Sequence, residues 1–160
     1  AKSSPVFGAV YKLAAVENEE GKIIPKIKIS ENTAKITTPH FKKVYRLYEK
    51  DSGKAIADQI CVYDEVIDDT QPLTIFDPMA VWKTKTLTDY TAQELLVPIF
   101  KRGKLVYKKP ELKEIREYCA EQIELQWDEV KRFENPHEYY VDLSERLWVI
   151  KRELLNDAAK

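Results

Sequence analysis

The sequence predicts an α+β fold, in which antiparallel β-hairpins form a sheet and two amphipathic helices follow at the C-terminal end. Three observations support this class. Hydrophobic residues make up 44% of the 160 residues, which is enough to build a core. Three glycine-containing turns separate short apolar runs in the first two thirds of the chain. After Pro110, apolar residues recur at three- and four-residue steps, the spacing of one helix face.

Residues 10–109 are expected to form the antiparallel β region. The predicted hairpins comprise residues 10–16 and 23–29 around Gly21, 44–48 and 55–62 around Gly53, and 97–100 and 104–107 around Gly103. Each glycine stands where a hairpin turn needs a residue that tolerates positive φ. The acidic stretch 64–78 contains two prolines and predicts a connecting loop, and residues 81–87 predict a short strand after it.

Residues 110–160 are expected to form a pair of helices. The first carries a single apolar stripe, about six turns long, made of Leu112, Ile115, Cys119, Ile123, Trp127 and Val130. Its end is predicted at Asn135-Pro136, because proline cannot continue a helix. The second helix is expected to begin near Asp142, which has the spacing of a capping box with Glu145. Its stripe consists of Leu143, Leu147, Ile150 and Leu154.

Charge and composition exclude several classes of protein. The 26 basic residues are balanced by 27 acidic ones, which argues against a nucleic-acid-binding protein. The sequence lacks both an apolar run long enough to span a membrane and the pattern of a signal peptide. With only two cysteines, Cys61 and Cys119, a reduced cytoplasmic setting is expected, although the sequence leaves a disulfide between them open.

The familiar catalytic motifs are absent, and four glycines are too few for a phosphate-binding loop. His137 has Glu134 and Glu138 close by, but a metal site needs three or four converging ligands. We therefore interpret residues 133–140 as a solvated turn between helices. His40, the other histidine, lies nearly a hundred residues away. No metal site and no catalytic residue is predicted.

Three further sets of residues receive structural interpretations. The carboxylates Asp64, Glu65, Asp68 and Asp69 could hold a cation, but their spacing is not that of a calcium loop, and a solvated loop is the preferred interpretation. Cys119 is expected to be a small buried hydrophobe on the first helix. Core packing is expected for the aromatic residues Tyr11, Tyr45, Tyr48, Trp82, Phe100, Trp127 and Trp148.

Several blocks of the sequence, in the same order, resemble nicotinate phosphoribosyltransferases of the bacterial type. The blocks are SSPVFGAVYKL at 3–13, PKIKIS at 25–30, KVYRLY at 43–48, GKAIAD at 53–58, LLVPIF at 95–100 and DEVKRFENPH at 128–137. In that family the first block directly follows the glycine-rich phosphate loop of the barrel. The resemblance therefore identifies the chain as the C-terminal part of such an enzyme, with residues 1–9 as a remnant of the phosphate-loop region.

The resemblance implies a known reaction. Such enzymes join nicotinate to 5-phosphoribosyl 1-diphosphate, forming nicotinate mononucleotide and diphosphate, with ATP hydrolysis driving the equilibrium in NAD salvage. Magnesium accompanies the diphosphate substrate. The implied parent has an α/β barrel beside a second domain built from both chain ends, and is a homodimer. For this segment the expected partner is the remainder of the enzyme, and no cofactor is expected on it.

The catalytic residues that the resemblance implies belong upstream of this chain, so none can be assigned here. Only Lys2, Ser3 and Ser4 adjoin the phosphate loop in sequence, and they are the candidates for its edge. Two hypotheses stay open: a structural C-terminal segment of the enzyme, or a free-standing interaction module derived from it. In the first case an apolar face meant for the rest of the enzyme should be exposed, with Tyr11, Tyr45 or Trp82 near the contact.

Overall fold

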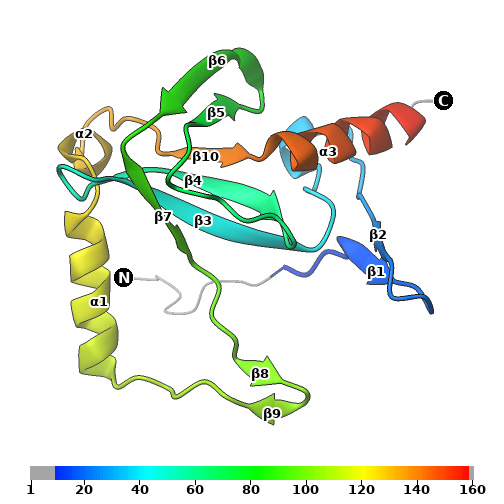
Figure 1. Ribbon diagram of the computed structural model, residues 1–160, viewed down its shortest axis with the longest axis horizontal. Helices are drawn as coiled ribbons and strands as arrows, with labels where there is room; N and C mark the ends of the chain where they lie inside the picture. Colours follow the sequence, from blue (N-terminus) through cyan, green and yellow to red (C-terminus); the bar gives the residue numbers. More distant parts are fainter. Residues whose placement is uncertain (1–9, 159–160) are drawn as a thin grey trace, which may run out of the picture. The chain divides into compact units, whose positions relative to one another are not determined.

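A computed structural model describes residues 10–158 of the chain. The chain divides into two compact units, each described here by itself. One unit comprises Ala1–Phe41 and Val149–Lys160, and the other comprises Lys42–Trp148. The described elements confirm the α+β class, with short antiparallel hairpins, a mixed sheet and three α-helices (Figure 1).

The larger unit is built on a four-stranded sheet with the strand order β10-β4-β3-β7. Strands β3 (Lys42–Glu49) and β4 (Ala55–Val62) pair antiparallel and confirm the predicted central hairpin. Gly53 in its turn has a φ of 66°, a conformation that side chains with a Cβ rarely adopt. Strand β7 (Tyr90–Glu94) adds antiparallel to β3.

Strand β10 (Tyr140–Leu143) pairs parallel to β4, at the edge of the sheet opposite β7. This corrects the prediction that the region around residue 140 only connects two helices. A four-residue strand has too short a pattern to identify, and its partner is some eighty residues earlier in the chain. The predicted cap is wrong as well: helix α3 (Glu145–Ala158) begins after Ser144, whose Oγ accepts a hydrogen bond from Leu147 N at 3.2 Å.

A second hairpin of the larger unit pairs β5 (Leu73–Asp77) with β6 (Ala80–Leu87). The predicted strand 81–87 is thereby confirmed within one residue, whereas the end of the predicted loop 64–78 is a strand. Pro72 and Pro78 lie directly before and after β5, so neither proline interrupts the strand. The turn is held by Asp77, whose Oδ1 accepts hydrogen bonds from Met79 N at 2.8 Å and Ala80 N at 3.2 Å.

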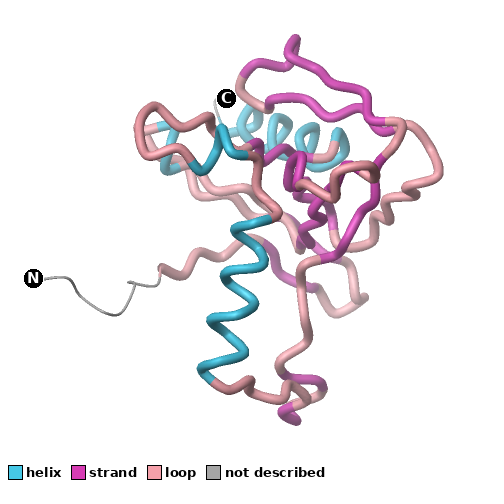
Figure 2. The backbone as a smooth tube through the Cα atoms, turned by 90° about the vertical axis from the view of Figure 1, so that its left-hand side faces the viewer, coloured by secondary structure: helices cyan, strands magenta, loops and turns pink. Residues whose placement is uncertain are grey.

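The other two predicted hairpins are present but much shorter than expected. In the smaller unit, β1 (Ala15–Glu17) pairs with β2 (Ile23–Pro25), and a 3₁₀ turn follows at Thr33–Lys35. In the larger unit, β8 (Phe100–Lys101) pairs with β9 (Lys104–Leu105). Loops make up most of the chain between β7 and helix α1, as Figure 2 shows.

The predicted six-turn helix is interrupted. Helix α1 (Leu112–Glu124) ends before Leu125, and a single turn, α2 (Asp128–Lys131), follows. The carbonyl groups at the break bind the β3–β4 hairpin: Lys54 Nζ donates to Glu124 O at 2.6 Å, and Ala55 N donates to Leu125 O at 2.8 Å. These tertiary hydrogen bonds satisfy carbonyl groups that a helix end leaves free. The helix can therefore end at Glu124, although the apolar spacing in the sequence continues beyond it.

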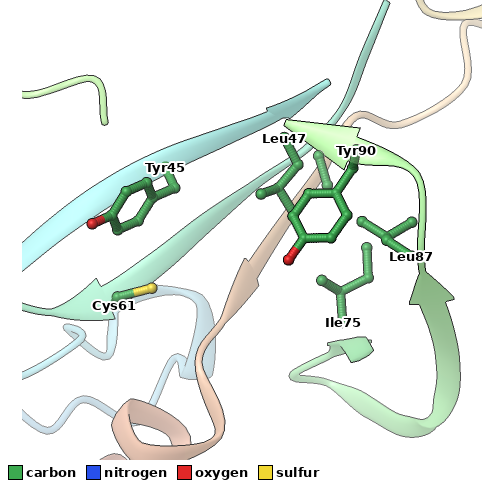
Figure 3. Close-up of a cluster of buried hydrophobic side chains, with 7 residues drawn as sticks. Tyr45, Leu47, Cys61, Ile75, Leu87 and Tyr90 are labelled. Atoms are coloured by element: carbon green, nitrogen blue, oxygen red, sulfur yellow. The ribbon is translucent and has the colours of Figure 1, made fainter. Parts of the chain in front are cut away.

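The core of the larger unit lies between the four-stranded sheet and the β5–β6 hairpin (Figure 3). Leu47 and Tyr90 lie at its centre, next to Ile75 and Leu87 from the hairpin. Tyr90 buries its ring and donates from its hydroxyl to Asp68 O and Gln71 O, at 3.2 and 3.1 Å. Tyr45, Ala57 and Cys61 complete the cluster.

Candidate functional site

The four carboxylates of the acidic loop after β4 bind other groups of the protein. Glu65 Oε2 accepts hydrogen bonds from Val62 N at 2.6 Å and from Ser144 Oγ at 2.8 Å. Asp64 forms an ion pair with Arg146 at 2.7 Å. These two carboxylates therefore fasten the loop to the start of α3.

The remaining two carboxylates of the loop are also used locally. Asp68 Oδ1 accepts from the backbone and the hydroxyl of Thr70, at 3.0 and 2.6 Å, and these hydrogen bonds lower the pKa of Asp68. Asp69 Oδ2 accepts from Ala92 N on β7 at 3.2 Å. Within residues 10–158, no three His, Cys, Asp or Glu side chains converge as metal ligands. The carboxylates of this loop therefore stabilise its conformation and its attachment to neighbouring elements.

The two histidines offer no acid–base pair. His137 is exposed, and its backbone N–H donates to Glu129 O at 2.8 Å. His40 lies in the smaller unit with a φ of 81°, and its Nδ1 accepts from Phe41 N at 2.9 Å. Each histidine thus holds a local turn of its own unit.

The cysteines are free thiols in different environments. Burial, helped by the charge of Glu65, raises the pKa of Cys61 to about 12, so this thiol stays protonated and is a poor nucleophile. Cys119 is exposed on α1, which overturns the expectation that it is buried. The reason is that α1 buries none of its residues, even though its stripe is apolar.

A polar cluster that the sequence did not reveal links α1, the sheet and the segment before β10. Arg46 donates through Nε and Nη2 to Asp58, at 2.8 and 2.9 Å, and through Nη1 to Gln122 on α1 at 3.2 Å. The Tyr139 hydroxyl donates to Asp58 Oδ1 at 2.9 Å. Arg46 also lies over the Tyr139 ring, 5.9 Å from its centroid. We call these four residues the Arg46 cluster.

The electrostatics of the Arg46 cluster indicate a structural role. Burial, and next the charge of Asp58, raise the pKa of Tyr139, so its hydroxyl remains a donor. The hydrogen bond to Asp58 likewise raises the pKa of Arg46. The guanidinium of Arg46 and the carboxylate of Asp58 form a bidentate, charge-assisted pair that holds β3 to β4.

The larger unit also contains a cavity of about 860 Å³ beside strand β10. Its walls come from β5, β6, α2 and the segment that leads into β10, and they include Asp77, Lys85, Trp127, Tyr139 and Asp142. Asp142 is only 4% exposed. Burial, and next the charge of Asp77, raise its pKa to about 6. We call this space the Asp142 cavity. Polar and aromatic groups border it, a lining suited to binding.

The aromatic residues separate into buried and exposed groups. Tyr45 is buried as predicted, and Trp148 packs edge-on against Phe76 with a centroid distance of 5.9 Å. Tyr11, Trp82, Phe100 and Trp127 are exposed, which contradicts their expected place in the core. The sequence signal failed because alternation along a strand does not show whether another layer covers its apolar side.

Lys2, Ser3 and Ser4, the candidates for the phosphate-loop edge, lie outside the described residues, as does the whole segment 1–9. Their role stays a prediction. Among residues 10–158, none of the helices combines the length and the apolar character that crossing a bilayer requires.

Comparison with known proteins connects this fold to one family. The family model described as the nicotinate phosphoribosyltransferase C-terminal domain matches residues 41–151. The nicotinate phosphoribosyltransferase of Bacillus subtilis is 41% identical over 98% of this chain, and that of Homo sapiens is 30% identical over 94%. The chain spans 32% and 27% of their respective lengths.

A solved structure agrees with the fold. The crystal structure of human nicotinic acid phosphoribosyltransferase superposes with a TM-score of 0.67 at 24% identity, over 74% of this chain and 24% of that chain. At this identity the likeness concerns the fold alone. The family model covers most of the described residues, including the sheet, the Arg46 cluster and the Asp142 cavity. The chain belongs to the nicotinate phosphoribosyltransferase C-terminal domain family.

Proposed function

We propose that this chain is the C-terminal part of a nicotinate phosphoribosyltransferase. The complete enzyme would join nicotinate to 5-phosphoribosyl 1-diphosphate, with ATP hydrolysis, and release nicotinate mononucleotide and diphosphate. The observation that carries the proposal is the family match over residues 41–151, together with relatives of that name over nearly the whole chain. The chain spans about a third of the Bacillus subtilis relative, which leaves room for a catalytic barrel elsewhere.

Within that enzyme the segment has a structural role. Its polar side chains bind one another: Asp58 pairs with Arg46, and Glu65 binds Ser144. Its buried thiol at Cys61 is held protonated. A transferase that acts on a diphosphate ester needs a site for phosphate and magnesium, and the carboxylates of the described loop are occupied by backbone and side-chain donors. We therefore place the magnesium and ATP sites on the remainder of the enzyme.

The same proposal includes the setting of the enzyme. It acts in the cytoplasm as a homodimer, and the main partner of this segment is the remainder of its own chain. The free-standing interaction module is the weaker hypothesis, because the relatives carry a similar sequence as about a third or less of a longer protein.

Activity assays test the proposal. Full-length enzyme incubated with nicotinate, 5-phosphoribosyl 1-diphosphate, magnesium and ATP should form nicotinate mononucleotide, whereas the 160-residue chain should form none above background. Omitting nicotinate is the control for both proteins. Turnover that rises with the concentration of the short chain would contradict the structural role, and an inactive full-length protein would contradict the assigned reaction.

A further inference from the structure

Asp142 is a buried hydrogen-bond acceptor on strand β10. Asp142 is 4% exposed and borders the Asp142 cavity, yet no side-chain hydrogen bond or ion pair reaches its carboxyl group from residues 10–158. A buried carboxyl group that lacks a donor is costly, so such groups are nearly always paired in folded proteins. The cavity leaves space beside this carboxyl group for a donor from outside the chain.

The neighbouring strand shows a second unmet acceptor. Asp142 is aligned with Gln59 in the parallel pair of β10 and β4. Gln59 is 3% exposed, and its Oε1 has no hydrogen-bond donor in the described part of the chain. Two adjacent side chains of the sheet, Gln59 and Asp142, therefore lack a hydrogen-bond donor among residues 10–158.

The charge of the cavity indicates what kind of donor it takes. Five acidic residues line it, against two lysines: Glu49, Asp77, Glu129, Glu138 and Asp142, with Lys83 and Lys85. The pKa of Asp142 is raised by burial and next by the charge of Asp77, so this carboxyl group has a carboxylate neighbour. The lining thus favours a positively charged ligand.

The geometry favours an organic cation over a metal ion. No metal-ligand triad of carboxylate, imidazole or thiol groups exists among residues 10–158. Trp127, Tyr139 and Phe76 add aromatic surface to the lining. A guanidinium group is planar, stacks on aromatic rings and carries five N–H donors, so it can serve several acceptors at once.

We propose that the Asp142 cavity receives an arginine side chain from the part of the enzyme outside this chain, and that this contact anchors the C-terminal segment. The inference rests on the proposed function, since it needs the longer enzyme. The chain covers 32% of the Bacillus subtilis relative, so most of such an enzyme is available to supply the arginine. The acidic excess of the lining provides the charge complementarity.

A small guanidinium compound tests the cavity in the 160-residue chain. Agmatine is the probe, butylurea is its uncharged counterpart, and KCl keeps the ionic strength constant. Agmatine should raise the melting temperature in a saturable way, by about 3–6 °C at ten times its dissociation constant, because it binds only the folded state. Butylurea should have no such effect. An equal response to both compounds would overturn the inference.

Substitutions locate the response. Asp142→Asn should abolish the agmatine shift, and Asp77→Asn should reduce it while keeping the Oδ1 acceptor of its turn. Asp51→Asn is the matched control, because Asp51 is an exposed turn residue away from the cavity lining, and its shift should equal that of the unsubstituted chain. An undiminished shift in Asp142→Asn would overturn the proposed site.

The full-length enzyme distinguishes an arginine of the protein from a free cation. There the cavity is filled, so agmatine should leave the melting temperature unchanged, and Asp142→Asn should lower it. A full-length enzyme stabilised by agmatine as strongly as the short chain would overturn the anchoring role. Product formation is measured separately: an active enzyme that fails these tests refutes the anchor alone, whereas an inactive protein that passes them refutes the assigned reaction alone.

Discussion

The buried side chain of Asp142 lowers the stability of the fold when its carboxyl group is ionised. In this chain Asp142 is 4% exposed, and its carboxyl group lies beside the cavity and near the charge of Asp77. These surroundings raise its pKa from 3.8 to about 6. The folded state therefore binds a proton more tightly than the unfolded state, and the stability of the fold decreases as the pH rises from about 4 through 6.

The isosteric substitution Asp142→Asn tests this linkage in the 160-residue chain. At pH 8 it should raise the free energy of unfolding by up to about 3 kcal/mol, because the buried charge is removed. At pH 4 the carboxyl group is protonated or nearly so in the folded state, and the two proteins should differ little. Urea unfolding at both pH values measures the difference. An equal effect at pH 4 and pH 8 would show that the charge is not responsible.

At the scale of secondary-structure elements, the Arg46 cluster joins three segments that are distant in sequence. Arg46 on β3 binds Asp58 on β4, Gln122 on α1, and the ring of Tyr139 just before β10. Helix α1 buries no residue of its own. Its described polar attachments to the sheet include this contact and the hydrogen bonds that Lys54 and Ala55 donate at its C-terminal end. Polar side chains thus join α1 to the sheet, because the helix contributes no buried apolar side chain to the contact.

Breaking the ion pair at its centre should cost much more than breaking a surface pair. The side chains of Arg46 and Asp58 are 18% and 13% exposed, so Arg46→Ala leaves a buried carboxylate and should lower the free energy of unfolding by about 3 kcal/mol. Lys113→Ala on α1, which removes an exposed ion pair with Glu117, is the control and should cost under about 0.5 kcal/mol. Chemical denaturation measures both. Similar losses for the two variants would argue against a structural role of the cluster.

At the scale of the whole chain, large apolar side chains remain uncovered. Leu112, Tyr118 and Ile123 on α1 are 70%, 60% and 51% exposed, and Trp82 on β6 is 76% exposed. Uncovered apolar groups of this number are typical of surfaces that bind another protein or another part of the same chain. Tyr45, expected near such a contact, is instead in the core.

The isolated chain should therefore self-associate as its concentration rises. The double variant Leu112→Gln and Ile123→Gln should associate less, and it should fold normally because α1 buries neither residue. Lys113→Gln, on the same helix, should associate like the unsubstituted chain. Light scattering over a concentration series gives the mass. A chain that is monomeric at every concentration would contradict the prediction.

The sequence by itself determined the features that depend on neighbouring residues. The α+β class and the central hairpin around Gly53 follow from local alternation and from a turn that requires positive φ, which is 66° in the structure. The family also followed from the ordered blocks of sequence, and the comparisons confirm it. Hairpin turns and strand patterns are encoded within a few residues, so they can be read without knowing the fold.

Only the tertiary structure decided the features that depend on distant contacts. Three such features depend on contacts between residues about seventy or eighty positions apart. They are the parallel strand β10, the break between α1 and α2, and the Arg46 cluster. The same is true of burial: Cys119 and Trp82 stand in apolar patterns, but another element must cover them to bury them, and no element among residues 10–158 does so. A local pattern gives the direction of an apolar side chain along its own element, whereas packing between elements determines what covers it.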